Sequence, residues 1–331
     1  MSASRETYHD VTLALATPAA RWRPPSRHLL VTAALLVAIL LVLGFIAPNF
    51  FRYNNITNVL LQTSLLGSLA LGMSVVMIVG GIDLSLPANM AMSAIFGALY
   101  MKATGDWMIG SLIMMGVGAT IGAINGMAVA WLKMIPFVVT LAMMTVVSGT
   151  AVWITNSLSI SQLPPAFLDL LSTKPIANIS VTVIVVAIIT MFVAVLMRSS
   201  IAGRWAYAVG INEKAARIAR VPISRVVLLS YVFSGLMAGI TAILLTTRLG
   251  AASANMGNDG VVLDIVSACV VGGISIYGGS GRVAGALFGA LLITVLSNTL
   301  NLVGVSFYLG LVIKGVVIIA YVAADRRRVR S

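Results

Sequence analysis

The chain has 331 residues, of which 60% are hydrophobic and only 9% are charged. A soluble globular domain carries about 25% charged residues, so this composition excludes an ordinary soluble protein and favours one whose surface faces lipid. The net charge of +12 does not indicate nucleic-acid binding, because the basic residues stand between apolar runs rather than in a stripe with aromatic residues.

Apolar runs predict the membrane-spanning helices. A helix needs about 20 apolar residues to cross a bilayer, and long stretches such as 29–51 and 134–168 contain no acidic or basic side chain. Because these runs do not alternate in the way a β-barrel requires, we predict an all-α integral membrane protein of one domain with about ten transmembrane helices. The expected spans lie near residues 29–47, 56–79, 84–101, 107–132, 135–155, 178–197, 226–247, 261–277, 283–303 and 305–323.

The basic residues predict the orientation. Residues 1–28 are polar and show no clear signal-peptide cleavage site, so we expect an uncleaved cytoplasmic tail, followed by a transmembrane domain over 29–324 and a basic cytoplasmic tail over 325–331. With ten spans and the N-terminus inside, one lysine lies within a span, four basic residues face outside and all the others face the cytoplasm, as the positive-inside rule requires. These five exceptions are Lys314, Arg52, Lys102, Lys174 and Arg248.

Two segments of the chain have similar sequences. The sequence Val-Gly-Gly-Ile at 79–82 recurs at 271–274, an offset of 192 residues (271 − 79), and small apolar residues near 94–99 match those near 286–291 at the same offset. An even number of spans separates the two copies, so the pattern predicts a parallel internal repeat. A chance match among small apolar residues is the alternative.

A carboxylate interrupts the apolar sequence at 80–85. Gly80 and Gly81 free the backbone at the end of a span, Asp83 or Ser85 can cap the next helix, and Pro87 suits its first turn. A carboxylate at membrane depth is costly and usually functional, whereas a helix cap at the cytoplasmic boundary is the structural alternative. The second Gly-Gly pair, Gly272 and Gly273, belongs to a glycine-dense turn that lacks the Lys-Ser/Thr ending of a phosphate-binding loop. We therefore expect gating or turn roles for both pairs.

The cytoplasmic segment 198–225 predicts a short helix that needs a partner surface. Asn212 can cap it, Glu213 lies in its first turn, and basic residues and Pro222 end it. We expect it to dock an ATPase, with a solvated connector as the alternative. The candidate coupling residues are Asn212, Glu213, Ala215, Ala216, Ile218, Ala219 and Arg220.

Polar residues within spans are the candidates for a substrate path. Asn125 lies in the fourth expected span, Asp264 in the eighth, and Asn298 and Asn301 one turn apart in the ninth. Hydrogen bonds between helices are the alternative for each asparagine, and an ion pair with Lys314 is the alternative for Asp264.

With one cysteine and two histidines, no metal site is expected, and no catalytic constellation is present in the sequence. The energy for active transport must then come from another chain.

The quoted segments resemble a known family, the permeases of ribose-type sugar ABC importers. The marker residues are GGIDLS at 80–85, GINEKAARIARVPISR at 210–225 and LDIVSACVVGGISIYGGSGRVAGALFGALLI at 263–293, and the resemblance covers roughly residues 30 to 325. It implies an inner-membrane protein that binds no cofactor itself and works with a cytoplasmic ATPase of two nucleotide-binding domains that carries ATP and Mg. It also implies a periplasmic sugar-binding protein and a second permease, identical or paralogous.

The resemblance has two departures. In the family's coupling element, Glu-x-Ala-Ala is followed by a glycine, but Arg220 stands at that position here, and Leu86-Pro87 follows GGIDLS where many relatives have Val-Gly. The docking geometry and the local turn are therefore expected to differ. The leading hypothesis is a monosaccharide permease, a pentose or hexose importer, and the sequence does not identify the sugar. Permeases for nucleosides or branched-chain amino acids, an ion-coupled secondary carrier and an intramembrane enzyme are the alternatives.

Overall fold

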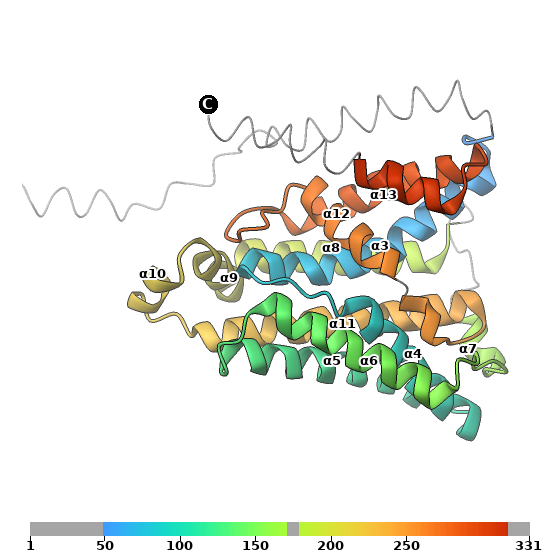
Figure 1. The fold of residues 1–331 in the computed structure, drawn as a ribbon, viewed down its shortest axis with the longest axis horizontal. Helices are drawn as coiled ribbons and strands as arrows, with labels where there is room; N and C mark the ends of the chain where they lie inside the picture. Colours follow the sequence, from blue (N-terminus) through green and yellow to red (C-terminus); the bar gives the residue numbers. More distant parts are fainter. Residues whose placement is uncertain (1–48, 171–178, 258, 317–331) are drawn as a thin grey trace, which may run out of the picture.

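A computed structural model of the chain describes residues 49–170, 179–257 and 259–316. Within these ranges the regular structure is helical, apart from an isolated bridge between Ile160 and Ala252. The elements, labelled as in Figure 1, are α3 (Tyr53–Val79), α4 (Leu86–Thr104), α5 (Trp107–Ala130), α6 (Pro136–Thr155), α7 (Pro165–Asp169), α8 (Val181–Ser199), α9 (Ile201–Ile211), α10 (Glu213–Ile218), α11 (Ile223–Leu249), η1 (Ala254–Gly257), α12 (Asp259–Val271) and α13 (Val283–Leu302).

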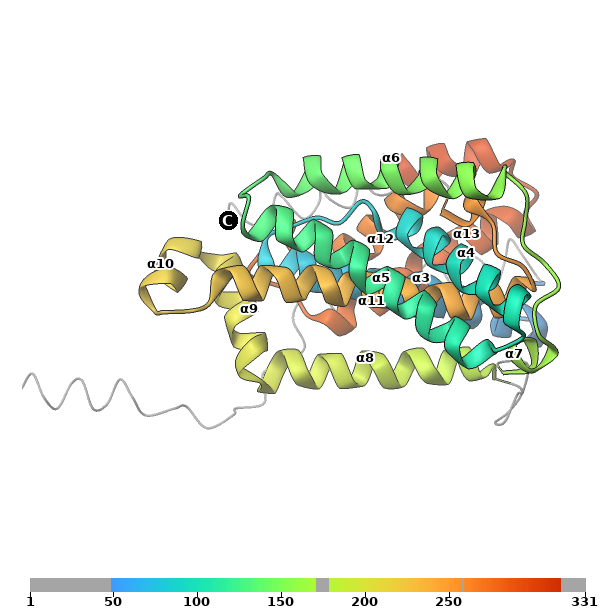
Figure 2. The ribbon, with the colours of Figure 1, turned by 90° about the horizontal axis from the view of Figure 1, so that it is seen from below.

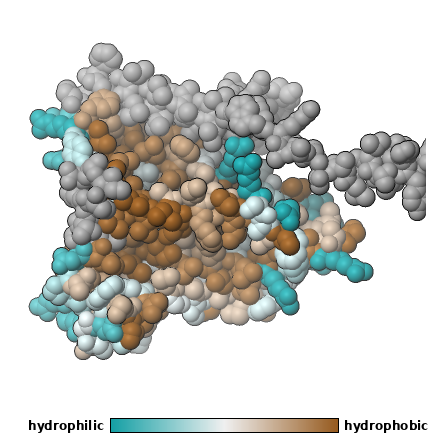
Figure 3. All heavy atoms as spheres, turned by 180° about the vertical axis from the view of Figure 1, so that it is seen from behind, coloured by the Kyte–Doolittle hydropathy of each residue, from teal (hydrophilic) through white to brown (hydrophobic). Residues whose placement is uncertain are grey.

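Six of these helices are long and apolar enough to cross a membrane: α3, α5, α6, α8, α11 and α13. They run roughly along one common direction, and α10 projects beyond them at one end of the bundle (Figures 1 and 2). We call this end of the bundle the α10 end, and we call the other end of the bundle the opposite end. Figure 3 shows a broad hydrophobic zone with hydrophilic side chains toward both ends, which is the surface that a bilayer requires.

The predicted spans agree with these six helices to within a few residues. The first expected span, 29–47, lies outside the described residues, and the last, 305–323, is described only as the helix Phe307–Val316. The all-helical membrane fold is therefore confirmed, while the count of ten spans stays a prediction.

Two predicted spans differ from the observed helices. The expected span 261–277 is wrong at its end, because α12 stops at Val271 and Gly273 turns the chain with φ 82°. Helix α4 corresponds to the expected span 84–101, but it is not among the six apolar helices. It is instead largely buried by protein, mainly α5, α6 and α11, so its polar side chains do not face lipid.

Close packing of α5 on α11 forms the middle of the bundle. Gly118 and Gly122 on α5 lie against Gly235 and Gly239 on α11, with no room for a Cβ atom at any of the four positions. Small residues at four-residue spacing let two membrane helices approach closely. This Gly-x-x-x-Gly signal is visible in the sequence, although none of the predictions above rests on it.

The two Gly-Gly segments end their helices in the same way. In α3, the Gly81 N–H donates to the Val76 carbonyl, and in α12, the Ile274 N–H donates to the Cys269 carbonyl. Both are the five-residue-spaced bonds of a Schellman ending, placed one residue later in the second copy. The packing that follows differs, since α12 packs extensively against α13 whereas α3 and α4 make few contacts. The duplication itself stays a prediction.

Candidate functional site

Residues 80–85 return into the bundle after α3 ends. Gly80 adopts φ 93° and closes α3, and the Asp83 N–H then lies 3.4 Å from the sulfur of Met73, which is more than one helical turn back from the end of α3. Helix α4 consequently begins beside the interior of α3 rather than at its tip. The predicted break is confirmed, and it places Asp83 inside the protein.

Asp83 is fully buried and its carboxylate is held by hydroxyl groups and the backbone. The backbone N–H of Ser85 donates to Oδ1 at 3.1 Å, the Ser85 hydroxyl donates to the same oxygen at 2.6 Å, and the Ser234 hydroxyl of α11 donates to Oδ2 at 2.8 Å. Ser85 occupies the N-cap position of α4 but its side chain makes no capping bond. Asp83 is therefore a buried junction between α4 and α11, which goes beyond the role of a boundary cap.

Asn125 of α5 joins the same network. Its Nδ2 donates to the Ser85 hydroxyl at 2.8 Å, and its Oδ1 is buried with no partner among the described residues. The carbonyl of Ile82 accepts bonds from the hydroxyls of Thr140 on α6 and Tyr231 on α11. We call the set Ile82, Asp83, Ser85, Asn125, Thr140, Tyr231 and Ser234 the polar hub. It ties the segment 80–85 to α5, α6 and α11.

A cavity of about 310 Å³ lies between α3, α4, α11, α12 and α13. Leu69, Met90 and Thr241 line its part toward the hub, whereas Arg248 and Ser297 line it toward the opposite end of the bundle. Met73, which contacts Asp83, follows Leu69 by four residues, a rise of roughly 6 Å along a helix. The hub thus lies directly below the cavity, on its α10 side.

The polar lining of the cavity combines uncharged groups with one arginine and one ion-paired acid. Its polar residues are Gln62, Thr241, Arg248, Asp264, Thr294 and Ser297. Both carboxylate oxygens of Asp264 accept hydrogen bonds from Lys314 at 2.9 Å, so this acid is neutralised where it borders the cavity. The two sequence interpretations of Asp264, path residue and ion-pair partner, are compatible in the structure.

The structure separates the other predicted path residues. Asn125 lies in the hub rather than in the cavity lining. Asn298 exchanges two amide hydrogen bonds with Asn55 of α3 at 2.9 and 3.0 Å, which is the helix-packing alternative, and Asn301 is exposed near the end of α13. The sequence did not single out Gln62, Thr241, Thr294 or Ser297, because such residues are common in helices and only the packing of five helices brings them together.

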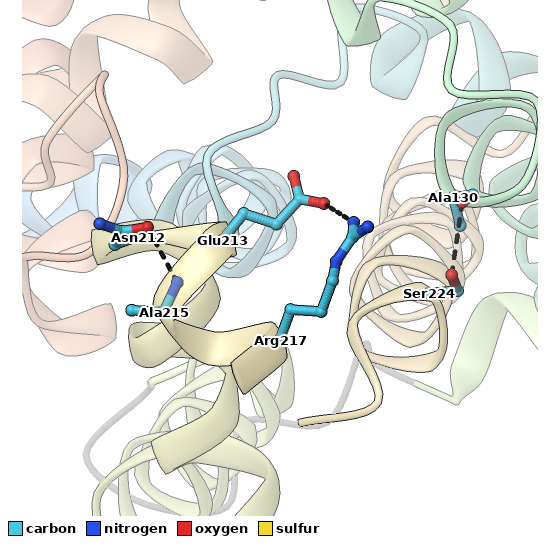
Figure 4. A network of polar contacts seen from close by, with 6 residues as sticks. All are labelled: Ala130, Asn212, Glu213, Ala215, Arg217 and Ser224. Atoms are coloured by element: carbon cyan, nitrogen blue, oxygen red, sulfur yellow. Dashed lines mark hydrogen bonds and ion pairs between the residues drawn. The ribbon is translucent and has the colours of Figure 1, made fainter. Parts of the chain in front are cut away.

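Helix α10 is built as the sequence predicts. The Asn212 side chain accepts a hydrogen bond from the Ala215 N–H at 3.1 Å, and Glu213 pairs with Arg217 at 2.8 Å (Figure 4). Ala216 is buried, whereas Ala215, Ala219 and the 86% exposed Ile218 face outward. A short helix with an exposed apolar side chain at the tip of the protein is suited to contact a partner.

Arg220 ends this helix in an unusual backbone conformation. Its φ is +58°, and the Val221 N–H donates to the Ala216 carbonyl, which completes a Schellman ending. Glycine is the usual residue at that position because an L side chain is strained there. Arg220 therefore adopts the backbone conformation that glycine usually supplies at a helix end.

Helix α9 connects α10 to the glycine-dense turn before α13. The Tyr207 hydroxyl donates to the Gly281 carbonyl at 2.9 Å. Burial raises the pKa of Tyr207, with nearby Arg282 opposing the shift, so the hydroxyl keeps its proton at neutral pH. Gly272 and Gly273 belong to the same turn, and a Cβ atom at Gly272 would overlap the backbone of Gly285 in α13.

Comparisons with known proteins identify relatives over most of the chain. The family model described as branched-chain amino acid transport system / permease component matches residues 55–322. The ribose import permease protein RbsC of Escherichia coli is 33% identical over 298 residues, covering 89% of this chain and 92% of that protein. The protein of the same name in Bacillus subtilis is 35% identical over 294 residues, covering 88% and 91%. The D-allose transport system permease protein AlsC of Escherichia coli is 34% identical over 303 residues, covering 89% and 90%. No solved structure gives a significant match.

Proposed function

The chain belongs to the family of branched-chain amino acid transport system permease components, and we propose that it is the membrane-spanning permease of an ATP-driven importer for a monosaccharide. Its relatives are named as import permeases for ribose and allose. The observation that carries the proposal is the cavity between five helices, whose polar lining is made of hydroxyl and amide groups, of Arg248 and of an acid that Lys314 neutralises. A neutral sugar needs such hydrogen-bond donors and acceptors rather than a net charge.

In this proposal the sugar enters the cavity from the opposite end of the bundle. Asp264 accepts hydrogen bonds from sugar hydroxyls, while Gln62, Thr294 and Ser297 supply further donors and acceptors. Lys314 positions Asp264 and neutralises its charge. The polar hub then forms the barrier below the cavity, and Asp83 and Asn125 belong to that barrier. Transport requires the hub to open toward the α10 end.

The energy comes from a separate cytoplasmic ATPase with two nucleotide-binding domains, which carries ATP and Mg. Helix α10 is the docking element, because Ala215, Ile218 and Ala219 present an exposed apolar surface beyond the bundle. This orientation places the α10 end and both termini in the cytoplasm of a bacterial cell. A periplasmic binding protein delivers the sugar, a second permease copy or paralogue completes the transporter, and this chain itself catalyses no reaction.

A branched-chain amino acid is the second candidate substrate, because Arg248 borders the same cavity and a guanidinium binds a carboxylate well. An amino acid also brings an ammonium group, which needs an anion. Asp264 is the acid among the described lining residues, and Lys314 already neutralises its charge, so no net negative charge remains for the ammonium group. The neutral sugar therefore fits the lining better.

Reconstitution tests the proposal directly. This chain would be expressed with the ATP-binding subunit and the binding protein encoded near it, and the complex would be placed in liposomes with a panel of pentoses, hexoses and branched-chain amino acids. We expect ATP hydrolysis to be stimulated by one monosaccharide. Stimulation by leucine or valine alone would establish the second candidate. Uptake by this chain alone on a proton or sodium gradient would overturn the ATP-driven mechanism.

A further inference from the structure

Three glycine segments meet at the α10 end of the bundle. They are Gly80 at the end of α3, Gly210 near the end of α9, and Gly278 with Gly279 in the turn between α12 and α13. The Gly279 N–H donates to the Ile78 carbonyl at 2.9 Å, which joins the turn to the last residues of α3. A contact thus connects segments that are about 200 residues apart (279 − 78 = 201).

Gly210 of α9 packs against this contact between α3 and the turn, and we call the three segments together the junction. A Cβ atom at position 210 would overlap both the Ile78 carbonyl oxygen and the Gly279 nitrogen. A Cβ atom at Gly278 would lie 2.9 Å from the Gly80 Cα and 3.1 Å from the Gly210 oxygen. The backbones of α3, α9 and the turn therefore touch directly. Contacts of this kind contain no side-chain rotamers that could absorb a displacement.

Tyr207 supplies a second link from α9 to the same turn. Its hydroxyl donates to the Gly281 carbonyl, and residues 207 and 210 are three positions apart, hence neighbours on one face of the helix. Burial of Val209 and Ala206 fixes α9 against its neighbours as well. Helix α9 is thus joined to the glycine turn by one side-chain hydrogen bond and by the backbone contacts of Gly210.

The junction lies between the docking element and the polar hub. Gly210 precedes Asn212, the N-cap of α10, by two residues, and Ile78 precedes Asp83 in the returning segment by five. A displacement of α10 reaches the start of that segment through α9 and this contact. Tyr231 and Thr140 then connect the segment, through the Ile82 carbonyl, to α11 and α6.

We propose that Gly210, in contact with Ile78 and Gly279, is a positioning residue that transmits movement of α10 to the hub and so couples ATP hydrolysis to opening of the cavity. This inference rests on the proposed function. It goes further by assigning the coupling to a backbone contact outside the docking surface. Tyr207 supports the same contact.

The test replaces Gly210 by alanine in the full reconstituted complex. The matched control is Gly116→Ala on α5, where an added Cβ has nothing within 4 Å. Co-purification of the ATPase, ATP hydrolysis without sugar, and hydrolysis with the monosaccharide that stimulates the wild-type complex are measured for each. Because the added methyl group would overlap backbone atoms, we expect Gly210→Ala to displace α9 from this contact. In the complex that assembles, stimulation by sugar should fall at least about fivefold, the lower end of typical coupling between two sites.

The possible outcomes distinguish a failure of the role proposed for Gly210 from a failure of the proposed transport function. A wild-type complex without sugar stimulation contradicts the proposed function itself. If sugar stimulates ATP hydrolysis equally in the wild-type, Gly116→Ala and Gly210→Ala complexes, the role of Gly210 is overturned. If Gly210→Ala fails to assemble, Tyr207→Phe decides, because it removes only one hydroxyl: decreased stimulation with intact assembly supports the junction, and full stimulation overturns it.

Discussion

The carboxylate of Asp83 accepts a 2.8 Å hydrogen bond from the hydroxyl of Ser234, although 151 residues separate them in the chain. The bond crosses from the returning segment after α3 to the middle of α11. Ser85 and Asn125 extend the network on the other side of the carboxylate. The network lies beyond Leu69, Met90 and Thr241, which line the cavity toward the hub.

Removal of the Ser234 hydroxyl is expected to weaken the hub. Ser234→Ala should lower the thermal stability of the purified protein by an amount that corresponds to roughly 1–2 kcal/mol, because a buried carboxylate loses a donor. Thr120→Ala is the control, since its exposed hydroxyl bonds only within α5. Equal melting temperatures for the two variants would show that the Asp83–Ser234 bond does not hold the hub together.

The packing of α5 on α11 predicts opposite effects for two glycines on one helix. Gly122→Ala should destabilise the protein by several kcal/mol, because the new methyl group would overlap the Tyr231 carbonyl. Gly116→Ala has open space around it and should be neutral, or stabilising by about 0.5–1 kcal/mol through helix propensity. Thermal unfolding in detergent measures both. Similar effects of the two substitutions would contradict the close approach of the helices.

The sequence predicts those features that depend on local chemistry. Runs of apolar residues fix where the long helices lie, and Asn212 and Glu213 fix the start of α10, because capping and hydropathy act within a few residues. The cavity is different, since Gln62, Thr241 and Ser297 resemble many other helical polar residues until three helices are packed together. The end of α12 was missed because Ile274 and Ile276 continue the apolar pattern although Gly273 has already turned the chain.

Arg220 offers a substitution that should increase stability. Its φ of +58° costs an L residue roughly 1 kcal/mol relative to glycine, so Arg220→Gly is expected to raise the melting temperature. It should also retain assembly with the ATPase, because the Schellman ending of α10 is preserved. As a control, Arg217→Gly lies inside the helix and should lower stability. A lower melting temperature for Arg220→Gly would mean that the arginine side chain makes a contribution larger than the strain.

Substitutions of Asp264 and Lys314 should have strongly non-additive effects on the free energy of unfolding. Lys314→Met alone leaves a largely buried carboxylate without its cation and should cost about 3–5 kcal/mol. The double variant Asp264→Asn with Lys314→Met should recover most of that loss, because no charge then remains unpaired. Unfolding of the four proteins gives the coupling energy directly. If the double variant is as unstable as the sum of the single ones, the two side chains do not act as a pair.

The same double variant separates stability from transport. A recovered fold with an amide in place of the carboxylate keeps the volume of the cavity but weakens the acceptor that we assign to the sugar hydroxyls. We therefore expect a raised KM for sugar-stimulated hydrolysis. An unchanged KM would remove Asp264 from the substrate path and leave it as a structural ion-pair partner.

Ala215→Glu tests the docking surface of α10. Ala215 is exposed beside Ile218, and its N–H rather than its side chain takes part in the cap of the helix, so the fold should tolerate a larger residue. A carboxylate at an apolar docking surface would be desolvated on binding, and we expect loss of ATPase co-purification or of sugar-stimulated hydrolysis. Ala215→Ser is the conservative control and should retain both. Wild-type stimulation in Ala215→Glu would place the docking surface elsewhere on the protein, because an ATPase that tolerates this charge does not bury residue 215.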